Sequence, residues 1–185
     1  AALILVGLAA SAFAAGTPAG STITNQATGT YKDANGNALT GVSSNPVTTT
    51  VSQVAGTSVG NVQALPLSSM SSVTYPVTLE NTGNGTDSFT ITSGTGGSEA
   101  ANTYTVEVYH DVDGSNTVTV GDTLATFAED IAADGTYAIL VQVTDTTSAG
   151  APNGDVIAVT LTSVSDFDGG VSDATVLTTT VQAAA

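Results

Sequence analysis

The chain has 185 residues and a formal net charge of −15, because 16 carboxylates face one lysine and no arginine. This charge excludes nucleic acid and anionic membrane surfaces as natural ligands, since binding phosphates requires Lys and Arg. The absence of cysteine excludes disulfides and thiolate zinc sites. With 41% apolar and only 9% charged residues, the chain can still build a core. Its remaining charge partners are cations, chiefly calcium, and basic proteins.

Residues 1–15 (AALILVGLAASAFAA) form an apolar stretch in which Ser11 is the single polar side chain. The run Leu3–Ala10, followed by Ala12–Ala14, has the pattern of a secretory signal with a small-x-small cleavage site. The stretch is shorter than the roughly 20 residues of a transmembrane helix, so we expect no stable membrane span. It is either a signal peptide or a retained assembly element, as a helix in a filament core or as a strand donated to a neighbour. Both alternatives place the protein outside the cytoplasm.

If the stretch is retained for assembly, its apolar side chains are expected to make the contacts. One largely buried apolar strand contributes on the order of 10 kcal/mol before entropy costs. A Gly/Pro joint (Ala15–Ser21) follows it. We divide the chain into three parts: the apolar segment 1–15, a joint with N-terminal strands at 16–56, and a main sandwich at 57–185. The main sandwich is expected to form one domain with residues 21–56. The assembly residues are Leu3, Ile4, Leu5, Val6 and Leu8.

From Ser21 onward the sequence has the pattern of short β-strands separated by Asn-Gly and Asp-Gly turns. Four segments alternate apolar and polar residues with a period of two, and no segment beyond residue 20 shows a sustained helical period. The sequence therefore predicts an all-β fold: an antiparallel β-sandwich, Ig-like or jelly-roll, of nine to ten strands with an apolar N-terminal arm. The expected strands are centred on Ser21–Tyr31, Asn45–Val54, Thr57–Leu65, Val73–Leu79, Thr86–Ser93, Tyr104–Val108, Thr123–Phe127, Tyr137–Val143, Ile157–Leu161 and Ala174–Gln182.

One acidic window has the composition of a calcium-binding loop. From Asp111 to Asp122, carboxylates occupy positions 1, 3 and 12 of a twelve-residue window, with a hydroxyl at position 5. Calcium prefers hard oxygen ligands of this kind. Glycine stands at position 4 rather than 6, so the window is not an EF-hand, and a metal-free Asp-Gly hairpin turn explains the same residues. The candidate ligands are Asp111, Asp113, Ser115 and Asp122.

Other polar residues are assigned surface roles. Asn84 opens the sequon Asn-Gly-Thr on an expected exposed turn, so it is a candidate glycan acceptor. Lys32 precedes the turn Asp33–Gly36 and is interpreted as a solvated edge lysine. His110 ends an alternating strand and, as the sole imidazole, cannot complete a metal site by itself. The Asp166–Asp168 segment is a thinner acidic pattern, for which we favour a turn.

Three parts of the chain carry a resemblance: Gly16–Tyr31 with Ser44–Val51, Tyr75–Phe89 with its Asn-Thr-Gly-Asn turn, and Gly154–Thr162. They resemble bacterial and archaeal secreted surface proteins that carry conserved β-sandwich repeats. The resemblance implies a cell-envelope or extracellular structural role and no particular activity. The layout, an apolar N-terminal arm joined to a secreted sandwich, is also similar to that of TasA-like and archaeal bundling-pilus subunits, which polymerise into extracellular filaments.

The residues favour a structural function over a catalytic one. With one histidine, no cysteine and no serine elbow, a catalytic triad has no support, so we expect no enzymatic activity. We expect an extracellular subunit that polymerises with copies of itself into a surface filament or pilus, by donor-strand complementation through the N-terminal segment. The alternative is a monomeric cell-surface adhesion or carbohydrate-binding module, which would depend on calcium if the acidic window binds it. It ranks lower because sugar sites commonly stack on aromatics, which are 5% of this chain.

Overall fold

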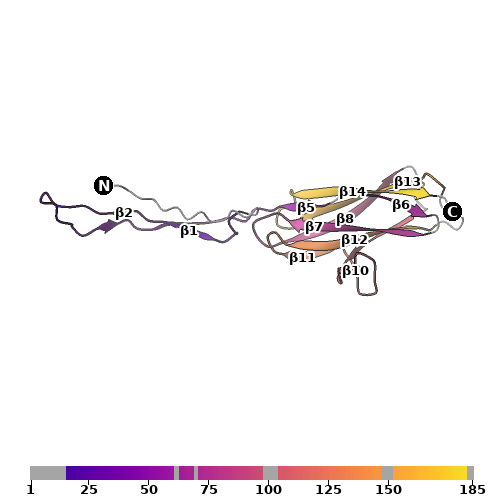
Figure 1. The fold of residues 1–185 in the computed structure, drawn as a ribbon, viewed down its shortest axis with the longest axis horizontal. Coiled ribbons are helices and arrows are strands. Elements are labelled where there is room, and N and C mark those ends of the chain that lie inside the picture. Colours follow the sequence, from indigo (N-terminus) through magenta and orange to yellow (C-terminus); the bar gives the residue numbers. More distant parts are fainter. Residues whose placement is uncertain (1–15, 61–62, 69–70, 98–103, 147–151, 183–185) are drawn as a thin grey trace.

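The computed structural model describes residues 16–60, 63–68, 71–97, 104–146 and 152–182. Within them, two five-stranded sheets pack face to face, and a two-stranded ribbon projects from one end of this sandwich along its long axis (Figure 1). These residues contain no helix, and hence none long and apolar enough to cross a membrane. The expected all-β sandwich is confirmed.

The described residues contain fourteen strands, of which ten form the sandwich and four short ones form the ribbon. The ribbon strands are β1 (Thr22–Asn25), β2 (Thr28–Gly29), β3 (Val42–Ser43) and β4 (Val47–Thr50). The sandwich strands are β5 (Thr57–Val59), β6 (Gln63–Ser68), β7 (Ser72–Asn81), β8 (Asp87–Gly97), β9 (Tyr104–His110), β10 (Thr123–Leu124), β11 (Phe127–Ile131), β12 (Thr136–Asp145), β13 (Val156–Ser165) and β14 (Ser172–Gln182).

The order of the strands is that of an immunoglobulin-type sandwich. One sheet has the order β10-β9-β12-β7-β5, and the other has β11-β8-β13-β14-β6. If β5, β7, β8, β9, β12, β13 and β14 are named A to G, the sheets contain A-B-E-D and C-F-G. The structure therefore favours the Ig-like alternative over the jelly roll. All pairs are antiparallel except β6 with β14, which is parallel.

Two segments expected to be single strands are divided where the chain passes from one sheet to the other. The expected strand Thr57–Leu65 is β5 in one sheet and the start of β6 in the other. The expected strand Thr123–Phe127 is divided into β10, paired with β9, and β11, paired with β8. Alternation alone does not reveal such a switch, because each half keeps its own inward and outward residues.

The core lies between the two sheets and follows the alternation of the sequence. Apolar side chains at alternate positions of β7, β12, β13 and β14 are buried. Tyr75 is also fully buried, and its hydroxyl donates to the carbonyl of Thr178 at 2.8 Å, so burial leaves no polar atom without a partner there. The largest fully buried side chains include Tyr75, Phe89, Leu67, Leu79, Ile139, Leu140, Ile157, Leu161 and Leu177.

The ribbon, residues 22–50, is held together by its own pairings. β1 pairs with β4 and β2 with β3, and the bridge between Lys32 and Ala38 leads to its tip. At the tip, the carboxylate of Asp33 accepts a hydrogen bond of 2.8 Å from the N–H of Asn37. Among the described residues, no ribbon strand pairs with a sandwich strand. A two-stranded ribbon of this kind is only marginally stable in water by itself.

Candidate functional site

The ribbon is attached to the sandwich by Asn84, in the turn between β7 and β8. Its Oδ1 accepts a hydrogen bond of 2.7 Å from the N–H of Val54, and its Nδ2 donates to the carbonyls of Thr17 and Ser52, each at 3.1 Å. Its backbone carbonyl accepts from the N–H of Ala19 at 2.8 Å. One residue thus holds the chain on both sides of the ribbon.

Two glycines allow the chain that follows the ribbon to approach this turn closely. A Cβ on Gly56 would lie 2.6 Å from Oγ1 of Thr82, and a Cβ on Gly83 would lie 2.6 Å from the carbonyl of Val54. Beside them, the buried Oδ1 of Asn81 accepts from the N–H of Gly83 at 2.9 Å. The Asn-Thr-Gly-Asn turn, part of the resemblance to secreted surface proteins, is therefore the clamp that holds the ribbon.

The sequon at Asn84 uses the same nitrogen as this clamp. A glycan would replace one hydrogen of Nδ2 and so leave one of the two carbonyls, Thr17 or Ser52, without its donor. Glycosylation of Asn84 stays a prediction. It competes with the attachment of the ribbon for one atom.

We expect Asn84→Ala to lower the free energy of unfolding by about 1–3 kcal/mol, because three hydrogen bonds of the clamp are lost. Thr86→Ala is the matched control: it destroys the sequon but keeps the Asn84 amide and the Thr86 carbonyl, which accepts from Gln53. This control should change the free energy by less than about 0.5 kcal/mol. Denaturant unfolding of both variants measures the difference. If Asn84→Ala unfolded at the same denaturant concentration as the wild type, another contact would have to hold the ribbon.

The surface of the ribbon is apolar in many places and almost uncharged. Its large apolar side chains are open to solvent, up to 69% exposed for Val47. Lys32 and Asp33 are the only charged residues in 1–79, so the net charge of −15 belongs entirely to 80–185. Exposed apolar side chains beside unpaired strand edges are typical of a surface that contacts another protein. The exposed apolar side chains of the ribbon are Ile23, Tyr31, Leu39, Val42 and Val47.

Among the described residues, no strand covers the end of β8, so one side of the sandwich is open there. β11 pairs only with the first part of β8, and the last bond on this edge joins the N–H of Ile91 to the carbonyl of Thr126 at 3.0 Å. Beyond it, Thr92–Gly97 pair with β13 on one side and with no described strand on the other. Ser93 shares the inner face with its partner Leu161, which is fully buried, yet Ser93 is exposed. The core therefore ends at this edge.

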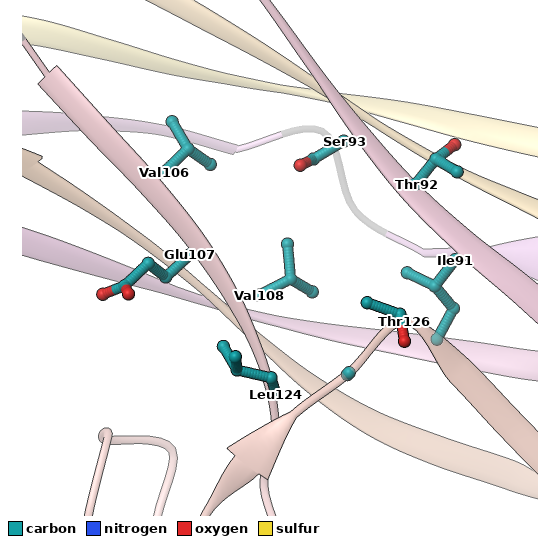
Figure 2. A pocket seen from close by; sticks show the side chains of 9 residues that line it. Ile91, Thr92, Ser93, Val106, Glu107, Val108, Leu124 and Thr126 are labelled. Atoms are coloured by element: carbon teal, nitrogen blue, oxygen red, sulfur yellow. The ribbon is translucent and has the colours of Figure 1, made fainter.

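The facing edge in the other sheet, that of β9, likewise has no described strand beside residues 104–107. Its contact with the segment Thr123–Phe127, which passes from one sheet to the other, ends at a 2.9 Å hydrogen bond from the N–H of Ala125 to the carbonyl of Val108. A cavity of about 480 Å³ lies between the two edges. Figure 2 shows Val106 and Val108 of β9 across this cavity from Ile91 and Ser93 of β8. We call this space the edge cleft and define it by Ile91, Ser93, Val106, Val108, Leu124 and Thr126.

The acidic window folds into a compact loop that brings three predicted ligands together. One carboxylate oxygen each from Asp111, Asp113 and Asp122 lies within 4.8 Å of the others, with Asp111 buried and Asp113 exposed. Such a cluster can bind a metal ion. The fourth candidate, Ser115, has its hydroxyl bonded to the carbonyl of Thr117 at 2.9 Å. The three carboxylates are therefore the core of the candidate site.

The loop also supplies its own hydrogen bonds to these carboxylates. Asp111 accepts from the N–H groups of Ser115 and Asn116 at 3.1 and 3.0 Å, and Asp122 accepts from that of Thr119 at 2.7 Å. Hydrogen bonds from Ser115 and, to a smaller extent, from Thr119 lower the pKa of Asp113. The carboxylates thus act as turn-forming groups whether or not an ion binds.

The other predicted residues have the following places. In the thinner acidic segment, Asp168 accepts from the N–H of Gly170 at 3.0 Å, as a turn residue does. His110 stacks on Tyr137, with ring centroids 4.1 Å apart and ring planes at 16°. Lys32 is exposed near the tip of the ribbon. The expected assembly residues Leu3, Ile4, Leu5, Val6 and Leu8 lie outside the described residues.

No protein-family model and no curated protein matches the chain. Among solved structures, the periplasmic chaperone SfaE matches 70% of this chain over 59% of its own, at 11% identity and a TM-score of 0.44. A family 123 glycoside hydrolase from Clostridium perfringens matches 71% of this chain over 28% of its own, at 8% identity and a TM-score of 0.46. AggA, the major subunit of aggregative adherence fimbriae type I from Escherichia coli, matches 70% of this chain over 95% of its own, at 12% identity and a TM-score of 0.29. The chain belongs by its strand order to the Ig-like β-sandwich class.

Proposed function

We propose that the chain is a structural, non-enzymatic subunit of the cell surface that polymerises with copies of itself into an extracellular filament. It donates its N-terminal segment to a neighbour, as the layout shared with TasA-like and archaeal bundling-pilus subunits implies. The observation that carries the proposal is the ribbon, residues 22–50, which projects from the sandwich with almost every side chain exposed (Figure 1).

A lone subunit gains little from this ribbon, because the ribbon covers no part of the sandwich core. Contact with a second copy would bury its apolar side chains and satisfy its strand edges. Two sandwiches repel each other, since each carries the whole net charge of −15. The uncharged ribbon can lie against a neighbouring sandwich without that repulsion.

The two ends of the subunit are also different from each other. The ribbon and the connection to residues 1–15 begin at the Asn84 turn, whereas β8 and β14 end at the opposite end of the sandwich (Figure 1). A contact between different surfaces of two copies is heterologous, and such contacts extend without closing unless the rotation forms a ring. This geometry supports a filament rather than a symmetric dimer.

Negative-stain electron microscopy of the purified chain with residues 1–15 present tests the proposal. We expect fibres, and we expect deletion of residues 1–15 to abolish them while the sandwich still unfolds cooperatively. Uniform monomers that retain residues 1–15 would contradict the proposal and favour the monomeric adhesion module. Unchanged fibres after the deletion would show that these residues are a signal remnant and not the donor.

We further propose that calcium is the cation held by Asp111, Asp113 and Asp122. At a free calcium concentration of about 100 Kd, binding to the folded state alone would stabilise it by about 2.7 kcal/mol. We expect calcium to raise the melting temperature of the wild type and of Asp168→Asn, the control in the other acidic turn, but not that of Asp113→Asn. Melting curves with calcium and with chelator measure the effect. Identical curves for the wild type would remove the site.

A further inference from the structure

We propose that the edge cleft is the acceptor site for residues 3–8 of a second copy, which add to β8 as an extra strand. This inference rests on the proposed function, because it assumes that copies polymerise. It assigns the surface through which the donated segment is held.

The first argument is the backbone of the open edge. The N–H of Ile91 points to this edge, where it bonds to Thr126. Backbone groups alternate between the two sides of a strand, so those of Ser93 and Thr95 point to the same edge. No described strand pairs with them there. A strand added along β8 would meet a ready row of donors and acceptors.

The second argument is the apolar wall of the cleft. Ile91, Val106 and Val108 line a space of about 480 Å³, and Leu124 at its mouth is 67% exposed. A backbone strand alone would leave this space empty, because only side chains directed inward can reach between the sheets. The occupant must therefore carry apolar side chains at alternate positions.

Residues 3–8 (LILVGL) have this pattern. Ile4, Val6 and Leu8 alternate, so they would lie on one face of a strand and point together into the cleft. Residues 1–15 contain no charged side chain, so the inserted segment brings no charge into the cleft. The ribbon strands fit less well, because they already pair with each other and are rich in Thr.

The third argument concerns which copy supplies the segment. A chain's own segment leaves from Gly16, close to Asn84 at the start of β8. β11 occupies the edge of β8 between that point and the cleft, so the segment would have to pass over β11 to reach it. A neighbour placed end to end brings its segment to the cleft without crossing that strand. We therefore assign the cleft to a second copy.

Disulfide trapping tests this assignment without background, because the chain contains no cysteine. Full chains with Val6→Cys are mixed with isotopically labelled full chains with Ser93→Cys, oxidised gently with glutathione disulfide, and analysed by mass spectrometry. We expect a mixed dimer at least about tenfold more abundant, equivalent to 1.4 kcal/mol, than with Thr160→Cys as acceptor. Thr160 is the matched control, since it is exposed on β13 in the same sheet but outside the cleft.

A blocking variant gives a second readout. Ser93 is exposed, so Ser93→Trp should fold normally and fill the cleft, and we expect it to reduce the yield of filaments at least about tenfold. Thr160→Trp should leave the yield unchanged, and melting curves check that both variants fold.

The outcomes separate this inference from the proposed function. If Ser93→Trp formed filaments at normal yield, the cleft assignment would be overturned and the polymer would stand. The same holds if filaments form but the Val6→Cys and Ser93→Cys chains give no mixed dimer. A chain with both Val6→Cys and Ser93→Cys that cross-links only within itself would assign the cleft to the chain's own segment and overturn the second copy. If the unsubstituted chain forms no filaments, the proposed function fails with it.

Discussion

Replacing residues 22–50 with an Asn-Gly dipeptide is expected to abolish filaments and leave the sandwich folded. The chain ends created by this change already lie in turn geometry, because the N–H of Val51 donates to the carbonyl of Ser21 at 2.8 Å. This is the bond that closes a two-residue turn, and Asn-Gly is the sequence that such turns favour. The ribbon contributes nothing to the buried core, so the melting temperature should stay close to that of the wild type. Electron microscopy and a melting curve on the same preparation measure both effects.

Two controls show whether the surface of the ribbon is responsible. Val47→Thr removes an exposed apolar methyl from the ribbon, whereas Val120→Thr makes the same change at an exposed valine of the acidic loop. Only the first should slow filament formation. Lys32, the single site for trypsin, should be cut in free subunits and protected in filaments. Filaments of normal yield without the ribbon would show that it is dispensable.

Phe89→Ala is expected to lower the free energy of unfolding by about 3–5 kcal/mol. Phe89 is fully buried on the inner face of β8, opposite the equally buried Ala128 of β11, so its removal leaves a cavity in the core. For a domain of this size the loss corresponds to a fall of about 6–20 °C in melting temperature.

The matched control is Phe167→Ala, the same substitution at a side chain that is 55% exposed. It should change the free energy by less than about 0.5 kcal/mol. Denaturant unfolding at equal protein concentration measures both variants. Similar losses in the two would mean that the sandwich core is not packed around Phe89 as described.

The sandwich itself could be predicted from the sequence, because its strands alternate strictly. In β7 and β13, the inward positions expected from the period of two are buried, as at Leu79 and Val159, except Val73, which is partly buried at the start of β7. The acidic loop could also be predicted, because candidate ligands close in sequence are brought together by local turns. Asp111 and Asp122 are eleven positions apart, yet their carboxylates meet.

The ribbon and the edge cleft could not be predicted, because both depend on which strands are neighbours. The strands at Thr22–Asn25 and Val47–Thr50 have an ordinary β-pattern, and only the topology shows that they leave the sandwich. The cleft did leave a signal. Along β8 the inward positions change from Phe89 and Ile91 to Ser93 and Thr95, small polar residues that mark where the core stops.

The direction of the strands has a mechanical consequence. The strands of the sandwich and the projecting ribbon run along the long axis of the molecule (Figure 1). In an end-to-end polymer, tension would therefore act along the strands and perpendicular to their hydrogen bonds, because antiparallel ladders bond across the strands. β13 and β14 are paired over nine successive positions, and so are β12 with β7 and β13 with β8, so a pulling force would load the bonds of each pair together instead of opening them one by one. Such a subunit would resist stretching most strongly along the direction in which it is joined to its neighbours.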